Sequence, residues 1–226
     1  MPHRSIHAPD PAGNDEHFEL LVIGAGQGGI PLANAFARAG RRVALVERVH
    51  VGGTCINEGC SPTKTVIAGA RVAHVMRRST TYGVQLVDDG GGVQRGPVDA
   101  RVRLGRVHER KQEIVVSFRS NSERGLASTG VRVILGQARF VGPRTVCVTG
   151  APAVGASSDG GRTLSADLVV INTGLRPAVP QIEGLGNVPY LTSTSILELT
   201  DVPEHLIVLG AGRPVVDPHG HLVSRR

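Results

Sequence analysis

The feature of this sequence that most restricts its fold is a glycine-rich turn between an apolar strand and an apolar helix. The strand is predicted over 19–23 (ELLVI), and the turn GAGQGG that follows places Gly24, Gly26 and Gly29 at Gly-x-Gly-x-x-Gly spacing. Glycines at these positions permit a tight turn and let backbone N–H groups approach a pyrophosphate, whose charge the helix N-terminus stabilises. The turn therefore predicts a Rossmann-like unit that binds a dinucleotide.

The second strand of that unit runs into an acidic side chain. The helix is expected to end at Gly40, and the buried strand 43–46 (VALV) is followed directly by Glu47, 18 residues after Gly29. A carboxylate at this place can accept hydrogen bonds from a ribose diol. A solvated glutamate beside an ordinary glycine turn is the alternative, and the motif alone does not separate FAD from NAD.

Two of the three cysteines, Cys55 and Cys60, lie in the glycine-rich loop that comes next. Their placement indicates redox chemistry and not the disulfide framework of a secreted protein. Residues five apart in a regular helix have α-carbons about 8.6 Å apart, whereas a disulfide needs roughly 4.4–6.8 Å. The pair therefore requires a distorted turn, which neighbouring glycines make accessible. These glycines are Gly52, Gly53 and Gly59.

A helix predicted over 62–78 begins just after Cys60, because Pro62 suits a first helical turn. A cysteine near a helix N-terminus is favoured as a thiolate. Two other residues that could attract attention are predicted to take no part in the chemistry. His74 is interpreted as a surface or packing residue of that helix, and Cys147 in TVCV as a buried small side chain.

Composition and the spacing of apolar residues predict an α/β fold. Hydrophobic residues make up 40% of the chain and aromatic residues 3%, which suits a parallel sheet built from Val, Leu, Ile and Ala. A surface loop is predicted over 82–97, and a short helix over 193–199 is predicted to be capped by Ser193. A long helix is predicted over 104–126 with an apolar stripe that includes Val107, Ile114, Val115 and Phe118.

The second half of the chain changes to short strands, of which the first three are expected to form a small antiparallel layer and the fourth to return to the main sheet. The strands are predicted over 131–135, 138–141, 145–148, 168–172 and 205–209. The expected organisation has three parts. These are a disordered tail over 1–16, an incomplete dinucleotide-binding domain over 17–200, and the start of a second such domain over 201–226.

The segment 52–64, GGTCINEGCSPTK, resembles the active-site signature of the pyridine nucleotide-disulfide oxidoreductases, the family of dihydrolipoamide dehydrogenase, glutathione reductase and mercuric reductase. Two cysteines, two glycine positions, a proline and a lysine fall in the register of that signature. The resemblance implies FAD as the cofactor, with Cys60 facing the flavin and Cys55 attacking the oxidised substrate. It also implies that Lys64 lies near the flavin N5, the alternative being a surface lysine in the first helical turn.

The same resemblance implies further contacts with FAD. Gln137 and Ala138 in LGQARF match the Gly-x-Ala segment that meets the adenine end, and INTGLRP matches the segment that ends the first FAD-binding portion. In INTGLRP the implied contacts with FAD are Thr173 and Gly174, and in the cysteine signature they are Gly53 and Thr54. The runs 62–78 and 189–210 are most similar to the mercuric-reductase-like members of the family.

The expected function is FAD-dependent reduction of a small-molecule disulfide or a metal ion, with electrons passing from NAD(P)H through the flavin to the Cys55–Cys60 disulfide. The alternatives are a noncatalytic FAD-binding or thiol-redox remnant, and a plain NAD-binding Rossmann protein, which the cysteine segment argues against. The sequence does not choose among lipoamide, glutathione and metal-ion substrates, nor between NADH and NADPH.

The resemblance covers about residues 17–212 and ends after IVLGAG, where Arg213 and Pro214 replace the start of a second dinucleotide-binding helix. The remainder of an NAD(P)H domain and a dimerisation domain are expected to be missing. The chain alone is therefore predicted to have little reductase activity, and a homodimer is expected of full-length members of the family more than of this chain.

Charge and hydropathy exclude two other classes of function. The net charge is +6, but the 25 cationic residues are scattered and lack interleaved aromatic residues, which argues against a nucleic-acid partner. No apolar run approaches the roughly 20 residues of a membrane span, and the first 16 residues lack an apolar signal core. A soluble cytoplasmic protein is the expectation.

Overall fold

The computed structural model describes residues 15–85, 87, 90–93, 100–150 and 161–209, together with two short strands near the C-terminus. Residues 1–14 of the predicted tail lie outside the described residues. Most of the predicted second domain, from residue 210 on, also lies outside them. The chain divides into two compact units, one of residues 1–53 and 121–174 and the other of residues 54–120 and 175–226. Each unit is described by itself.

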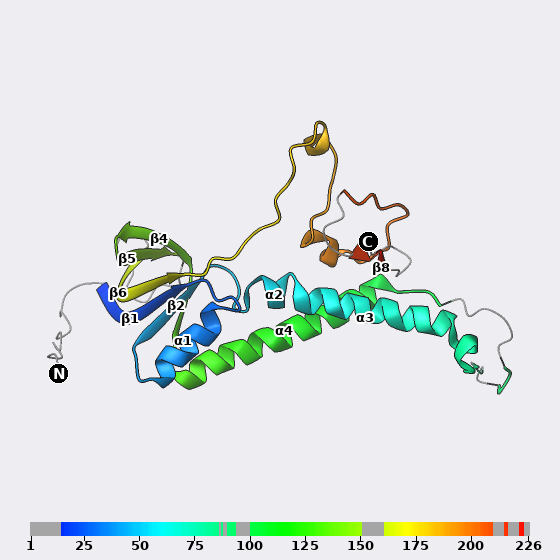
Figure 1. The fold of residues 1–226 in the computed structure, drawn as a ribbon, viewed down its shortest axis with the longest axis horizontal. Coiled ribbons are helices and arrows are strands. Elements are labelled where there is room, and N and C mark those ends of the chain that lie inside the picture. The colour runs from blue at the N-terminus through cyan, green and yellow to red at the C-terminus, as the bar shows by residue number, and fades with distance from the viewer. Residues whose placement is uncertain are drawn as a thin grey trace. The chain divides into compact units, whose positions relative to one another are not determined.

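The first unit is built on one six-stranded sheet with the order β3-β2-β1-β6-β5-β4 (Figure 1). β1, β2, β3 and β6 pair in parallel, whereas β5 pairs antiparallel with both β4 and β6. The predicted α/β fold with a parallel sheet and a small antiparallel part is therefore confirmed. The strands are β1 Asp15–Ile23, β2 Val43–Glu47, β3 Arg132–Leu135, β4 Gln137–Gly142, β5 Thr145–Thr149 and β6 Gly161–Ile171.

Two strands are longer than predicted, and this changes how the antiparallel part is attached. β1 begins at Asp15 instead of residue 19, and β6 begins at Gly161 instead of residue 168. The added part of β6 pairs in register with β5 on one side, Val146 opposite Leu164, and with β1 on the other. The antiparallel strands thus continue the main sheet and do not form a separate layer.

Both faces of the sheet are covered by buried apolar residues. On one face, β4 and β5 contribute to a cluster with the inner strands that includes Phe18, Leu21, Val146 and Leu164. On the other face, the helix α1 (Gly29–Arg38) and the end of α4 (Leu104–Thr129) pack over the strands around Leu45. Burial of this much aliphatic surface on both faces is the main stabilising contribution to the unit.

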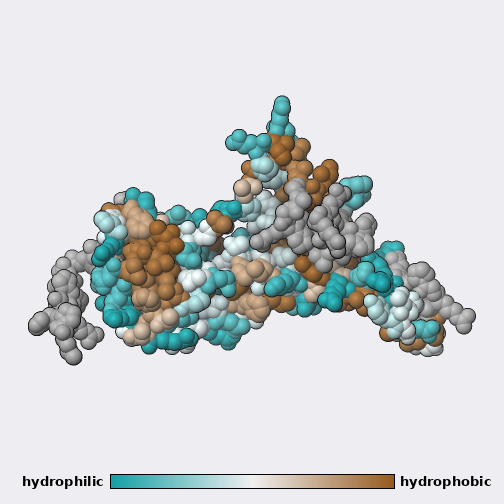
Figure 2. All heavy atoms as spheres, in the orientation of Figure 1, coloured by the Kyte–Doolittle hydropathy of each residue, from teal (hydrophilic) through white to brown (hydrophobic). Residues whose placement is uncertain are grey.

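The outer surface of the first unit also carries apolar side chains, which gather over the strands in the view of Figure 2. Cys147 on β5 was predicted to be a buried small side chain and is half-buried instead. The reason is strand alternation, because Val146 and Val148 point into the cluster and Cys147 points to the opposite face. On that face its sulfur atom would lie 2.6 Å from a Cβ built on Gly161.

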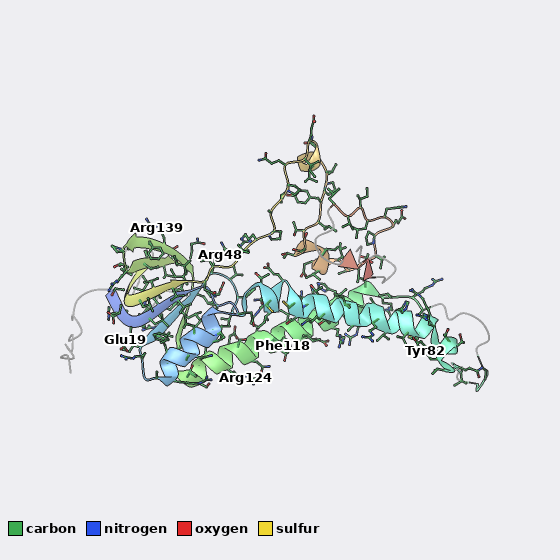
Figure 3. All side chains as sticks on the ribbon, viewed as in Figure 1. Glu19, Arg48, Tyr82, Phe118, Arg124 and Arg139 are labelled. Carbon is green, nitrogen blue, oxygen red and sulfur yellow. The ribbon has the colours of Figure 1, made fainter. Side chains whose placement is uncertain are left out.

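The second unit is mainly helical, and α3 and α4 run side by side in it (Figure 1). Gly69 of α3 faces Val107 of α4, since a Cβ built on Gly69 would lie 3.5 Å from a methyl group of Val107. Phe118 was predicted in the apolar stripe of α4 but is 46% exposed (Figure 3), whereas Val115 is buried as predicted. The elements are α2 Gly53–Asn57, α3 Cys60–Arg77, η1 Ser79–Tyr82, η2 Leu185–Asn187, η3 Ser195–Glu198, β7 Val215–Val216 and β8 Leu222–Val223.

Residues 175–209 form few regular elements. The predicted strand 205–209 is absent, and Ile207 within it is 85% exposed. A strand forms by pairing, and no strand among the described residues pairs with this segment. The predicted helix 193–199 is a short 3-10 helix, in which the Thr192 hydroxyl, and not Ser193, accepts a hydrogen bond from the Ser195 N–H. No helix in the described part of the chain is long and apolar enough to cross a bilayer.

Candidate functional site

The glycine turn after β1 is crowded enough to require glycine. Gly24 has a φ of +106°, and a Cβ there would lie 2.1 Å from the carbonyl oxygen of Asn172. A Cβ on Gly29 would lie 2.3 Å from the Gly24 carbonyl oxygen. The helix α1 starts at Gly29, and its N-cap Gly28 contributes no side-chain hydrogen bond. The first N–H groups of α1 thus have no side-chain cap, as an anion site at a helix N-terminus requires.

Gly53 brings the loop before the cysteines against this turn. Gly53 has a φ of +61°, and a Cβ on it would lie 2.6 Å from the α-carbon of Gly26. The Gly52 N–H donates to the Ala25 carbonyl at 2.8 Å, and the Gln27 side chain donates to the Gly52 carbonyl at 3.3 Å. At Gly26 and Gly53 the two backbone segments therefore approach each other too closely for a Cβ on Gly53 to fit between them.

Glu47 lies at the end of β2 beside the turn, as predicted. Its carboxylate accepts hydrogen bonds from the N–H groups of Ala25 at 2.8 Å and Val49 at 3.0 Å. Each carboxylate oxygen keeps further acceptor capacity, so a ribose diol can still be bound. The Glu47 carbonyl accepts from the Gly136 N–H at 2.8 Å, which places the predicted residue Gln137 just after this contact, at the start of β4. Ala138 packs against the buried cluster of the sheet.

Asn172 was not predicted as a site residue, yet it organises the turn. It follows β6, and its side-chain Nδ2 donates to the Gly24 carbonyl at 3.0 Å. A Cβ built on Gly26 would lie 3.2 Å from its Nδ2, and a Cβ built on Gly28 would lie 3.0 Å from its Oδ1. The available signal was its position directly before Thr173 and Gly174, both of which were predicted to contact the cofactor.

The predicted residues of the first unit thus gather at one edge of its sheet. Gly24, Glu47 and Thr173 lie at or just beyond the carboxyl ends of the parallel strands β1, β2 and β6. The α-carbon of Thr173 lies 3.2 Å from a Cβ built on Gly24, and Gly174 follows with a φ of +70°. In open α/β sheets this edge is where ligands bind.

The second unit contains the cysteine pair. Cys55 lies in α2 and Cys60 is the first residue of α3, and the helices are separated by a break at Glu58 and Gly59. The predicted departure from a regular helix is therefore confirmed. A Cβ on Gly59 would lie 3.0 Å from the Thr54 carbonyl oxygen, so the break is close-packed.

The two cysteines are free thiols whose side chains meet. Cys55 is half-buried and Cys60 is exposed. The side-chain hydrogen bond between Cys55 and Cys60 favours the protonated Cys55 and raises the pKa of its thiol, burial adds to the rise, and the positive charge of Lys64 opposes it. Lys64 is exposed near the start of α3, one turn after Cys60, and Thr54 is exposed in α2. The two cysteine side chains are thus within hydrogen-bonding distance of each other.

The described residues include no group of three or more His, Cys, Asp or Glu side chains that could hold a metal ion. His74, which was interpreted as a surface or packing residue, is exposed on α3.

Comparison with protein families matches residues 18–213 to the pyridine nucleotide-disulphide oxidoreductases. The chain belongs to this family. The prediction from the cysteine signature is therefore confirmed at the level of the family, which consists of FAD-dependent oxidoreductases.

Curated relatives within the pyridine nucleotide-disulphide oxidoreductases include two kinds of enzyme. A mercuric reductase of Lysinibacillus sphaericus is 34% identical over 200 residues, which cover 88% of this chain and 33% of the relative. A dihydrolipoyl dehydrogenase 2 of Haloarcula marismortui is 37% identical over 195 residues, which cover 86% of this chain and 38% of the relative. The chain spans about a third of the length of the curated relatives it matches.

A solved structure from the same family has the same fold. It is the Cu(II) complex of RclA, an HOCl-induced flavoprotein disulfide reductase of Escherichia coli, with a TM-score of 0.67 and 31% sequence identity. The match covers 87% of this chain and 38% of RclA.

Proposed function

We propose that the chain binds FAD through its first unit and exchanges electrons between FAD and the Cys55–Cys60 pair, within an NAD(P)H-dependent reduction of disulfides or metal ions. The observation that carries the proposal is the meeting of the two thiols across a helix break, in a chain whose other unit presents a dinucleotide-binding turn. The names of the relatives support a metal ion or a disulfide as the class of substrate.

The residues of the first unit fit FAD. The backbones of Gly24, Gly29 and Gly53 are packed too closely for side chains, and the uncapped N-terminus of α1 favours the negative pyrophosphate. Glu47 would hold the ribose hydroxyls. The proposal also assigns cofactor contacts to six residues whose roles follow from the family signature. These are Thr54, Lys64, Gln137, Ala138, Thr173 and Gly174.

The thiol pair would perform the substrate half of the reaction. The Cys55 thiolate attacks one sulfur of a substrate disulfide, forms a mixed disulfide and expels the first substrate thiol. The Cys60 thiolate then attacks the Cys55 sulfur and expels the second thiol, so that two protein thiols become one S–S bond while the substrate gains two electrons and two protons. Bound FAD supplies the two-electron chemistry that returns the pair to dithiols.

The raised pKa of Cys55 has a consequence for this role. With its proton held by the contact with Cys60 and by burial, Cys55 attacks faster as the pH rises toward its pKa. The positive charge of Lys64 counteracts the rise, which gives this lysine a role in the proposal that does not depend on contact with FAD.

A second candidate is a module that binds FAD or exchanges thiols without reducing a substrate. It is favoured because each half of the candidate site forms within a single unit. The glycine turn forms within the first unit, and the thiol pair forms within the second.

One experiment separates these functions. The chain is oxidised to the Cys55–Cys60 disulfide, supplied with FAD, and reduced with two electron equivalents of dithionite, and free thiols are counted by alkylation and mass spectrometry. The proposal expects two new thiols only when FAD is present, no new thiols in Cys55→Ser, and normal behaviour in Cys147→Ser. FAD bound with no FAD-dependent thiols would support the noncatalytic module instead.

A further inference from the structure

The turn between the two cysteines is held from outside by α4. The Arg119 guanidinium donates from Nε at 3.1 Å and from Nη2 at 2.8 Å to the same side-chain oxygen of Asn57. Both residues are half-buried and lie 62 positions apart in the sequence. Asn57 is the last residue of α2, two positions after Cys55 and three before Cys60.

This contact is suited to fixing a turn. A planar guanidinium that donates two N–H groups restricts both the position and the direction of its acceptor, more than a flexible single donor would. Hydrogen bonds to a charged group are also about twice as strong as neutral ones. The next residue, Glu58, has a weaker external contact, because the Thr194 hydroxyl reaches its carboxylate only at 3.4 Å and on an exposed surface.

We propose that Arg119 is a positioning residue that, through Asn57, holds the Cys55–Cys60 turn in the geometry from which the disulfide closes. The inference rests on the proposed function of the cysteine pair. Closing a disulfide in a turn that is already ordered loses less conformational entropy than closing it in a loose one. Arg119 therefore favours the disulfide over the dithiol, although it touches neither sulfur.

The effect is measurable as a thiol–disulfide equilibrium. In a glutathione buffer, the two protein thiols and one oxidised glutathione convert to the protein disulfide and two reduced glutathiones, with atoms and electrons in balance. Arg119→Ala is expected to lower this equilibrium constant about tenfold, the factor that corresponds to the backbone entropy of about one residue, which a loosened turn would have to lose when the disulfide closes. A tenfold change in a two-electron couple is about 30 mV.

The experiment uses the full chain with matched variants. Arg124→Ala is the control, because Arg124 lies farther along α4 (Figure 3) and bonds Asn121 of the same helix. Asn57→Ala removes the acceptor instead of the donor, and the double variant Arg119→Ala with Asn57→Ala tests whether the two residues act together. Far-UV circular dichroism checks the helices in each variant, and alkylation with mass spectrometry gives the disulfide fraction.

The expected result is an equal shift in both single variants, no larger shift in the double variant, and no shift in Arg124→Ala. Unchanged equilibrium constants in the single variants, or shifts that add in the double variant, would overturn the inference. If Arg119→Ala loses its helical signal, Asn57→Ala carries the test, since it removes the same contact with a smaller change. A parent chain that forms no Cys55–Cys60 disulfide in any buffer would instead refute the proposed function.

Discussion

Among the described residues, Lys111 is the only charged side chain that is fully buried, and its surroundings allow a quantitative prediction. Its ammonium group donates to the Leu197 carbonyl at 2.6 Å and to the Glu198 carboxylate at 2.7 Å. Its side chain is 1% exposed, whereas that of Glu198 is 54% exposed and also contacts His108 at 3.0 Å. Lys111 thus attaches the 3-10 helix η3 to α4 within the second unit.

The cost of breaking this pair depends on which partner is changed. Glu198→Gln leaves a buried ammonium with a neutral acceptor, and breaking a fully buried pair costs about 3–5 kcal/mol. Because Glu198 is half-exposed, solvent screens the pair, and we expect about 2 kcal/mol. Lys111→Met keeps the buried stem, removes the charge and lets the exposed carboxylate rehydrate, so about 1 kcal/mol or less is expected. Lys111→Ala adds a cavity and should cost about 3 kcal/mol.

The assay is urea unfolding followed by circular dichroism, with hydrogen exchange in α4 to report on the second unit. The predicted order of destabilisation is Lys111→Met, then Glu198→Gln, then Lys111→Ala. If Lys111→Met were more damaging than Glu198→Gln, the buried charge would not be the dominant cost, and the reasoning would be refuted.

The same contact predicts a dependence on pH. Burial raises the pKa of Glu198, but hydrogen bonds and charges from Lys111 and His108 outweigh it, so the pKa is lowered overall. A carboxyl with a lower pKa in the folded state contributes stability that is fully present above its unfolded pKa of about 4.3 and is lost as the pH falls through the folded pKa. Glu198→Gln should remove this acid-sensitive part of the unfolding free energy.

Three further predictions concern the two half-sites. In urea unfolding, Gly24→Ala should cost more than about 3 kcal/mol, because its Cβ would lie 2.1 Å from a backbone oxygen. Gly40→Ala should cost only about 1 kcal/mol, because Gly40 has a φ of +76° but open space around it. Asn172→Ala should cost about 1 kcal/mol and weaken binding in a fluorescence titration with FAD. Cys60→Ala should lower the pKa of Cys55, seen as faster alkylation at neutral pH; unchanged alkylation would contradict the role of the thiol contact.

Local sequence signals predicted the parts of the structure that local chemistry determines. The turn after β1 was predicted because only glycine tolerates its backbone conformation and crowding. The helix break between Cys55 and Cys60 followed from the size of a disulfide compared with the geometry of a helix. Both predictions depend on residues within a few positions of one another.

The errors have a different cause, because they concern residues that depend on distant partners. The first part of β6 contains polar residues and becomes a strand only because β5 and β1 pair with it on both sides. Residues 205–209 are apolar enough for a strand, but none of the described strands pairs with them. Strand propensity therefore missed the first part of β6 and wrongly predicted a strand over 205–209, and in both cases pairing decided the outcome.

The same distinction bears on the candidate site. The cysteine signature indicates the kind of chemistry, but the residues that hold its turn in place come from elsewhere in the chain. Arg119 is 62 positions from Asn57 and belongs to a helix whose sequence carries no recognisable motif. A signature can therefore match in every position while the redox equilibrium of its cysteines is set by a distant arginine. Comparing that equilibrium among chains with the same signature requires knowing what contacts the turn, which only the three-dimensional structure supplies.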